Sequence, residues 1–202
     1  MEYINLFRYF DKILVDNGTV LISLMYDRDN PSKTLKQICD IEEQTNFKLA
    51  DIITWVKHPV LPNNMSPNRT TRLHEEIYVF CRESEFKTFN TNKKVKSYRM
   101  TGQPNYTNIN NVIYAFIRDK GVKTFNHNVF STELVEELLH MYVKEKNIVL
   151  DPFTGSGSVV VACTKYKCKW IGSEIDKTQV EYAMMRVLEK RKEMRKKKII
   201  NK

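Results

Sequence analysis

A glycine-rich turn in the last third of the sequence is the segment best suited to chemistry. A short apolar run ends at Asp151, and a helical pattern begins after the residues Pro152, Phe153, Thr154, Gly155, Ser156 and Gly157. Glycines let a ligand approach the backbone closely, and the amides at a helix N-terminus attract polar or anionic groups. Glu174 ends the next apolar run, where a carboxylate can accept both hydroxyls of a ribose. The pattern predicts a nucleotide-cofactor site.

Two other nucleotide-binding patterns do not fit this turn. A phosphate loop needs Gly-Lys-Ser or Gly-Lys-Thr after its first glycine, and neither tripeptide follows here. The three-glycine spacing of the dinucleotide-binding fingerprint is also absent. A plain glycine turn between a strand and a helix remains the alternative, and the residues on both sides of the turn favour the cofactor site.

The spacing of apolar residues indicates the elements that must position this turn. Apolar and β-branched runs predict strands at 19–25, 52–58, 76–82, 147–151 and 168–175, with a further strand-like piece at 111–117. Helical spacing predicts helices over 2–15, 31–45, 131–143 and 156–166, and a last one from residue 177. Ser131 or Thr132 is expected to cap the third helix. Strands that alternate with helices favour an α/β fold with a parallel sheet.

The 202-residue chain is basic, and its charge is concentrated in two segments. It has 33 Lys and Arg against 24 Asp and Glu, a formal net charge of +9, and 42% hydrophobic residues. Residues 87–123 and 186–202 each carry a net +7. Such segments favour a polyanionic partner, with nucleic acid ahead of a membrane surface, and solvated charged faces are the alternative. The composition is that of a globular chain and excludes general disorder.

The sequence gives no indication of a membrane span, of secretion or of a metal site. No apolar run reaches the roughly 18 residues of a membrane span, and the first residues lack the pattern of a signal peptide. The four cysteines are therefore expected to be reduced, and together with the four histidines they show no metal-ligand spacing. We expect a cytoplasmic or nucleoid-associated protein without a metal.

The glycine-rich turn and its surroundings resemble a known protein family. Residues 151–158 read Asp-Pro-Phe-Thr-Gly-Ser-Gly-Ser, which is similar to the S-adenosylmethionine-binding motif of the amino DNA methyltransferases. These enzymes methylate the exocyclic nitrogen of adenine or cytosine. Residues 14–24, 53–82 and 126–127 resemble further motifs of the permuted group of this family, in which the cofactor motif is C-terminal. The resemblance implies a Rossmann-like methyltransferase domain over residues 1–190, followed by a basic tail at 191–202.

The resemblance also implies roles for individual residues. Asp151, Phe153, Gly155 and Gly157 would surround the methionine and sulfonium part of S-adenosylmethionine, Glu174 would hold its ribose, and the turn around Phe130, Ser131 and Thr132 would close the pocket. Residues 84–126 occupy the family's target-recognition position, and double-stranded DNA is the expected partner. Our candidates for phosphate contacts are Lys93, Lys94, Lys96 and Arg99, and those for stacking on or reading a base are Tyr98 and Tyr106.

The family's catalytic motif has no counterpart in this sequence. Its members use Asp, Asn or Ser followed by two prolines and an aromatic residue to hold the target amino group and stack on the flipped base. None of the six prolines here adjoins another, and residues 103–106 are only a superficial match, so we assign no catalytic residue. About five of the family's seven strands are predicted. We therefore interpret the chain as a fragment, a decayed reading frame, or a subunit whose catalytic strand comes from another polypeptide.

Two functional hypotheses follow. The first is a DNA methyltransferase, or part of one, that transfers a methyl group from S-adenosylmethionine to the amino group of adenine or cytosine. The second is an inactive subunit that binds the cofactor and DNA and partners an active methyltransferase chain; a homodimer is another arrangement. An RNA or protein methyltransferase would share the glycine-rich turn but would not explain residues 53–82.

Overall fold

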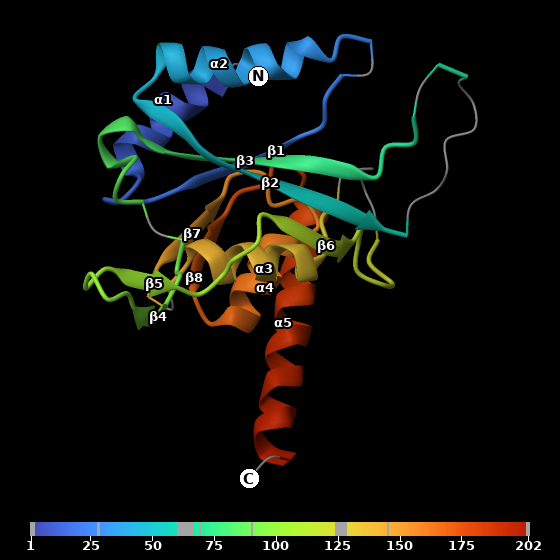
Figure 1. The fold of residues 1–202 in the computed structure, drawn as a ribbon. Helices are drawn as coiled ribbons and strands as arrows, with labels where there is room; N and C mark the ends of the chain where they lie inside the picture. Colours follow the sequence, from blue (N-terminus) through green and yellow to red (C-terminus); the bar gives the residue numbers. More distant parts are fainter. Residues whose placement is uncertain are drawn as a thin grey trace. The chain divides into compact units, whose positions relative to one another are not determined.

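The computed structural model describes residues 3–27, 29–59, 67–68, 70–89, 91–123, 129–144 and 146–200 (Figure 1). The chain forms two compact units, residues 1–113 and residues 114–202. Both contain helices and strands, which confirms the predicted α/β class. None of the helices within the described residues is long and apolar enough to cross a membrane.

The first unit is built on a sheet with two helices packed on one face (Figure 1). Its elements are α1 (Tyr3–Ile13), β1 (Val20–Leu24), α2 (Ser32–Gln44), β2 (Phe47–His58), β3 (His74–Arg82) and the short 3-10 helix η1 (Glu83–Glu85). Strand β6 (Val112–Phe116) begins in this unit and completes a four-stranded sheet of order β1-β3-β2-β6. The predicted strands at 19–25, 52–58, 76–82 and 111–117 are all present.

Pairing in this sheet differs from the parallel arrangement that we expected. Strand β3 runs antiparallel to both of its neighbours, with Val20 of β1 opposite Phe80 and Ile53 of β2 opposite Ile77. Antiparallel neighbours need no helical crossover, and residues 59–73 between β2 and β3 contain no helix in their described part. The expectation of a parallel sheet was therefore wrong for β1, β2 and β3.

An aromatic cluster fixes the two helices to this sheet. Phe7 of α1 is fully buried, and its ring meets those of Phe47 and Phe80 edge-on, with centroids 5.1 and 5.0 Å apart. Ile38 and Ile41 of α2 belong to the same cluster. Each such side chain stabilises the fold by roughly 1.5–3 kcal/mol through burial. This packing explains why the apolar spacing of residues 2–15 and 31–45 predicted both helices.

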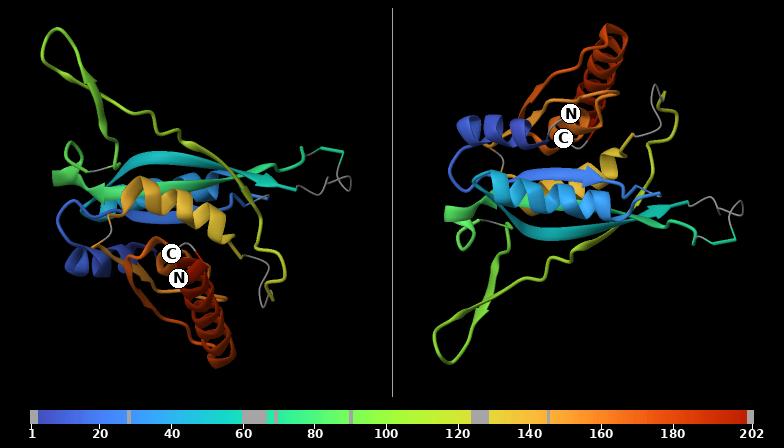
Figure 2. Two further views of the ribbon diagram at one scale, coloured as in Figure 1. Left: turned by 90° about the horizontal axis from the view of Figure 1, so that it is seen from below. Right: turned by 90° about the horizontal axis from the view of Figure 1, so that it is seen from above.

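The polar segment after β3 contains a two-stranded ribbon that the sequence did not indicate. Strands β4 (Val95–Tyr98) and β5 (Pro104–Tyr106) pair antiparallel with each other and with no other strand in the described part of the chain. In the turn between them, Gly102 adopts a φ of +80°, which glycine tolerates without strain. Figure 2 shows the ribbon extending away from β1, β2 and β3 of the same unit. We call these residues the β4–β5 ribbon.

The second unit carries the predicted cofactor turn. Its elements are α3 (Thr132–Tyr142), β7 (Ile148–Asp151), α4 (Ser158–Tyr166), β8 (Lys169–Gly172) and α5 (Lys177–Ile200). Strands β7 and β8 pair in parallel, as expected for a strand–helix–strand unit. Helices α3 and α4 share a core that contains Val135, Leu139, Ala162 and the buried thiols Cys163 and Cys168. Residues 191–200, predicted as a basic tail, continue α5.

Candidate functional site

The glycine turn, residues 152–157, is held by hydrogen bonds at the carboxyl ends of the two parallel strands β7 and β8. Asp151 ends β7, and its carbonyl oxygen accepts hydrogen bonds from the Ser173 amide at 3.0 Å and the Thr154 hydroxyl at 3.1 Å. The Thr154 amide in turn donates to the Ser173 carbonyl at 2.9 Å. Ligands of open α/β sheets bind outside the carboxyl ends of the strands. The turn therefore lies where a cofactor site is expected.

The structure brings Glu174 onto the glycine turn. Its Oε2 accepts a hydrogen bond from the Gly155 amide at 2.8 Å, and its Oε1 accepts from the amides of Ile175 and Asp176 at 2.9 and 3.0 Å. These backbone hydrogen bonds, that of Asp176 foremost, hold the pKa of Glu174 below its ordinary value. The carboxylate is therefore ionised at neutral pH and presents negative charge beside the turn.

The pKa of Asp151 is shifted in the opposite direction to that of Glu174. Burial raises the pKa of the Asp151 carboxyl, and the neighbouring charge of Glu174 raises it further, while a hydrogen bond from the Phe153 amide at 3.2 Å opposes the shift. An ionised carboxylate in this position gains stability when a cation is placed beside it. The site thus combines one readily ionised acid with one that favours a positively charged neighbour.

The two glycines of the turn have different structural roles. Gly157 has a φ of +88°, and a β-carbon there would lie 2.7 Å from the β-carbon of Ala183 in α5. Gly155 also has a positive φ, +51°, but the nearest atom to its β-carbon would be the Gln179 Oε1 at 3.6 Å, an ordinary contact. Gly157 therefore permits close packing of the turn on α5, whereas Gly155 leaves space on its outer side.

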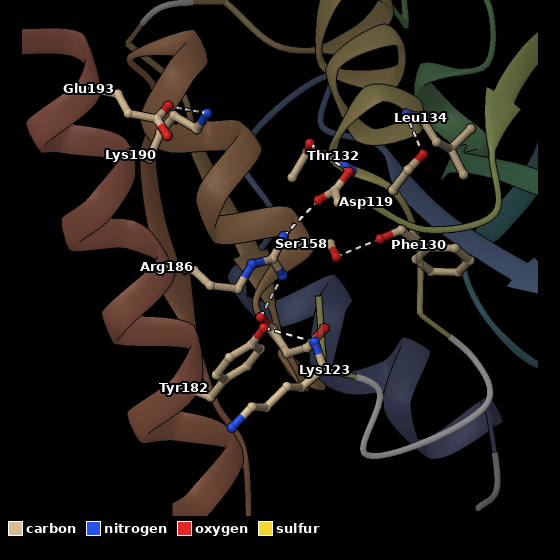
Figure 3. A network of polar contacts seen from close by, with 12 residues as sticks. Asp119, Lys123, Phe130, Thr132, Leu134, Ser158, Tyr182, Arg186, Lys190 and Glu193 are labelled. Carbon is tan, nitrogen blue, oxygen red and sulfur yellow. Dashed lines mark hydrogen bonds and ion pairs between the residues drawn. The ribbon is translucent and has the colours of Figure 1, made fainter. Parts of the chain in front are cut away.

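A buried arginine connects the glycine turn to the N-terminus of α3 (Figure 3). Arg186 of α5 is 8% exposed; it donates to the Ser156 carbonyl at 2.7 Å and pairs with the Asp119 carboxylate at 2.7 Å. The other Asp119 oxygen accepts from the Thr132 amide and hydroxyl at 2.8 and 3.0 Å. These contacts bring the predicted residues Ser156 and Thr132 into one polar network.

The other predicted pocket residues lie at the start of α3. The Ser131 hydroxyl accepts a hydrogen bond from the Leu134 amide at 3.2 Å, which confirms Ser131 as the N-cap. The Ser158 hydroxyl, at the start of α4, donates to the Phe130 carbonyl at 2.5 Å and so ties the two helix starts together. Asn126 and His127, the residues that carry part of the family resemblance, lie outside the described residues.

Sequence reasoning did not identify Arg186 or Asp119. Arg186 appeared to be the first member of the basic segment 186–202, and Asp119 the single acid of the other. A signal was present, because Gln179, Ala183 and Arg186 have the spacing of one helix face, and all three are buried. An arginine on a buried helix face needs acceptors, and this could have marked it as part of the site.

The predicted DNA contacts lie in the first unit, on the β4–β5 ribbon or just before it. Lys96, Tyr98, Arg99 and Tyr106 belong to the ribbon and its turn, and Lys93 and Lys94 precede β4; all six are exposed. Thr107 closes the base of the ribbon, because its amide donates to the Lys94 carbonyl at 2.8 Å and its hydroxyl accepts from the Lys94 amide at 3.1 Å. The ribbon and the two residues just before it therefore carry all six predicted residues.

Two charged residues of segment 53–82, which carries part of the family resemblance, form a buried polar cluster in the first unit. Lys57 of β2 forms an ion pair with Glu75 of β3, and their side chains are only 14% and 9% exposed. The Ser23 hydroxyl of β1 also donates to Glu75, at 3.4 Å. Trp55 is 2% exposed and packs in the core. Within the described residues, no cluster of His, Cys, Asp and Glu could hold a metal ion.

A sequence model of the family described as DNA methylase matches residues 3–185. The chain belongs to this family. The match confirms the resemblance to the amino DNA methyltransferases. The chain is also 21% identical, over 91% of its length and 69% of the relative's, to the type II methyltransferase M.Cfr9I of Citrobacter freundii.

Solved structures similar to this chain establish its fold. The M1.HpyAVI–SAM complex superposes with a TM-score of 0.68 at 23% identity, covering 91% of this chain and 81% of that one. The cytosine-N4-specific PvuII DNA methyltransferase gives a TM-score of 0.67 at 18% identity, covering 91% and 70%. A putative DNA modification methylase from Thermus thermophilus, complexed with S-adenosyl-L-methionine, gives 0.60 at 18%, covering 93% and 75%. The predicted Rossmann-like methyltransferase fold is confirmed.

Proposed function

We propose that this chain binds S-adenosylmethionine at the glycine turn and takes part in methylating the exocyclic amino group of adenine or cytosine in double-stranded DNA. The observation that carries the proposal is the Glu174 carboxylate beside a glycine turn at the ends of two parallel strands. Two of the similar solved structures are complexes with this cofactor, which supports the proposal.

The exposed groups around the turn suit the parts of this cofactor. Glu174 offers an acceptor for ribose hydroxyls. In dinucleotide-binding strand–helix–strand units, an acidic residue at the end of the second strand binds the ribose in this way. Phe153 of the turn and Ile175, which follows Glu174 in the chain, are 55% and 102% exposed, and these apolar side chains would be covered by the adenine ring or the methionine chain. The space outside Gly155 allows close approach to the turn. The ionised Asp151 would favour the sulfonium cation.

Binding of a ribose to Glu174 requires a local change in the turn. A carboxylate has about four acceptor positions, and three backbone amides already use three of those on Glu174. Accepting two hydroxyls would therefore displace one amide. That of Gly155 is the best candidate, because it alone of the three binds Oε2, whereas those of Ile175 and Asp176 share Oε1 and directly follow Glu174 in the chain. S-adenosylmethionine supplies an activated methyl group, and the residues of this chain would bind it, orient it and keep water away.

The β4–β5 ribbon supplies the proposed contacts with DNA. Lys96 of the ribbon, with Lys93 and Lys94 just before it, would contact phosphates, while Tyr98 and Tyr106 would stack on bases or sugars. This assigns target recognition to residues 84–126 within a methyltransferase domain of residues 1–190. The basic residues 191–202 would add a general attraction to DNA.

An inactive subunit is the second candidate function. It is favoured by the sequence itself, in which none of the prolines adjoins another and the Pro-Pro-aromatic motif is therefore absent. In that case the chain would bind S-adenosylmethionine and DNA, and an active methyltransferase chain would carry out the transfer.

The experiment is methyl transfer from radiolabelled S-adenosylmethionine to duplex DNA by the full chain, with nucleosides separated after digestion. Label in N6-methyladenine or N4-methylcytosine, abolished in Glu174→Gln, would establish the enzyme. Binding of cofactor and DNA without transfer would favour the inactive subunit. A folded chain that binds neither would contradict both.

A further inference from the structure

The β4–β5 ribbon has two chemically different faces. Val95 pairs with Tyr106, Ser97 with Asn105, and Tyr98 with Pro104, with a bulge at residue 96. Partners in an antiparallel pair lie on the same face, and neighbours along a strand lie on opposite faces. One face therefore presents Val95, Tyr98 and Tyr106, and the other presents Ser97 and Asn105.

The polar face holds Arg99 in a defined position. The Arg99 amide donates to the Gln103 carbonyl at 2.8 Å, and its carbonyl accepts from the Gly102 amide at 2.9 Å, so its backbone is fixed at the start of the turn. Its side-chain Nε donates to the Asn105 Oδ1 at 2.8 Å. The Asn105 Nδ2 donates to the Ser97 hydroxyl at 3.2 Å, which orients the amide toward Arg99.

This arrangement leaves the outer edge of the guanidinium available. Only Nε is engaged, and within the described part of the chain neither terminal nitrogen of Arg99 has a partner. The two terminal N–H groups form a planar fork that matches two adjacent acceptors. Because Asn105 already restricts the side chain, less conformational entropy is lost when the fork binds.

We propose that Arg99, positioned by Asn105, reads a guanine in the DNA target through the O6 and N7 atoms in the major groove. The inference rests on the proposed function, since it assigns the base-reading residue of the same DNA-binding ribbon. A two-stranded ribbon fits the major groove, and a bidentate arginine–guanine pair is the commonest specific contact there. Asn105 is a positioning residue, because its own amide is used on Arg99 and Ser97.

Arg99 is distinguished from the neighbouring lysines by its contacts. Among the described residues, the side chains of Lys93, Lys94 and Lys96 are exposed and form no hydrogen bond or ion pair, as suits flexible point charges that follow phosphates. Arg99 is the only one of the four cations whose side chain is held by another side chain of the ribbon. We had placed Arg99 with these lysines as a phosphate contact, and its fixed fork instead favours a base.

The test selects bound duplexes from a random library with the full chain and S-adenosylmethionine, then sequences them. Wild type should enrich guanine at one position. Arg99→Lys keeps the charge but loses the fork, and it should reduce that preference about 5- to 150-fold while retaining the others. Asn105→Ala should reduce the guanine preference by a smaller factor than Arg99→Lys does. The matched variant Lys96→Ala should weaken binding to all sequences alike and keep the guanine preference.

Two results would overturn the inference. Uniformly weaker binding by Arg99→Ala, with every sequence preference retained, would make Arg99 a phosphate contact. A wild-type chain that binds DNA without preferring guanine at any position would also exclude it, while leaving the proposed function intact. If the folded wild-type chain binds no DNA, the proposed function fails, and the inference fails with it. Circular dichroism confirms the fold of each variant.

Discussion

The two glycines of the turn show how residues of one type can have separate roles. Gly157 is required by packing, because a β-carbon there would meet Ala183 at 2.7 Å, whereas Gly155 has room for one. Both have a positive φ, which disfavours alanine by roughly 1–2 kcal/mol. The sequence alone assigned both glycines to the ligand, since their spacing carries no information about α5.

We predict different defects for the two alanine variants. Gly157→Ala should lower the free energy of unfolding by about 3 kcal/mol or more, because strain and a steric clash add. Gly155→Ala should lower it by only about 1 kcal/mol and should weaken S-adenosylmethionine binding in the folded protein. Urea denaturation and calorimetric titration measure the two effects. Equal losses of stability would contradict this assignment of roles.

The raised pKa of Asp151 predicts a pH dependence of cofactor binding. Burial disfavours the ionised carboxylate, so its penalty for folding is absent below the ordinary pKa near 3.8 and complete above the raised pKa. A cation bound beside it favours ionisation. Affinity for S-adenosylmethionine should therefore be full above the raised pKa and fall as the pH is lowered through it. Titrations at several pH values should show this for wild type, and a similar fall in Asp151→Asn would contradict it.

At the scale of elements, Arg186 connects α5 by hydrogen bonds to the glycine turn and to the segment before α3. It joins the glycine turn, through the Ser156 carbonyl, to Asp119 and thus to the start of α3. We predict that Arg186→Met lowers the free energy of unfolding by about 3 kcal/mol, because it leaves the Asp119 Oδ2 and the Ser156 carbonyl without the partner that they have in wild type. The exposed Arg191→Met, further along α5, should change it by less than about 0.5 kcal/mol. Similar midpoints in thermal or urea denaturation would refute this role.

The helices and the main strands could be predicted from sequence because burial imposes a period on them. Phe7 and its neighbours at helical spacing marked α1, and the apolar runs at 147–151 and 168–175 marked β7 and β8. The second run was predicted too long, because β8 ends at Gly172. The start of β2 at Phe47 was missed, because an irregularity between Leu49 and Asp51 interrupts the alternation. The β4–β5 ribbon was missed because both of its faces are largely solvent-exposed, so no buried face marks its strands.

The geometry around the glycine turn could be predicted where local sequence determines it. The glycine turn, Glu174 and the Ser131 cap follow from short motifs around strand and helix ends. The Arg186–Asp119 pair depends on residues 67 positions apart, and a sequence without the fold cannot show that they meet. The antiparallel pairing of β3 could have been inferred, because residues 59–73 offered no helical pattern for a crossover.

At the scale of the whole molecule, the two basic segments have different structural settings. Residues 87–123 include the β4–β5 ribbon, whereas residues 186–200 lie on α5 and begin with the buried Arg186. Part of the charge in the second segment therefore serves the fold. The exposed lysines of the ribbon remain our proposed phosphate contacts.

Salt dependence of DNA binding should separate these two segments. Replacing Lys93, Lys94 and Lys96 by Ala should reduce the slope of log K against log salt by about 2.7, at roughly 0.9 per lost phosphate contact. Replacing Lys196, Lys197 and Lys198 by Ala removes the same charge from α5 and should reduce this slope by a smaller amount. Binding isotherms at several salt concentrations measure both. Equal reductions would show that the ribbon has no special role.

The most direct test of the account is a calorimetric titration of the full chain with S-adenosylmethionine. Wild type and Glu181→Gln, a variant of an exposed acid on α5, should bind one cofactor per chain with similar affinity. Glu174→Gln should bind at least about tenfold more weakly, because charge-assisted hydrogen bonds to the ribose are lost. A folded wild-type chain that gives no binding heat, or Glu174→Gln binding as tightly as wild type, would contradict the account.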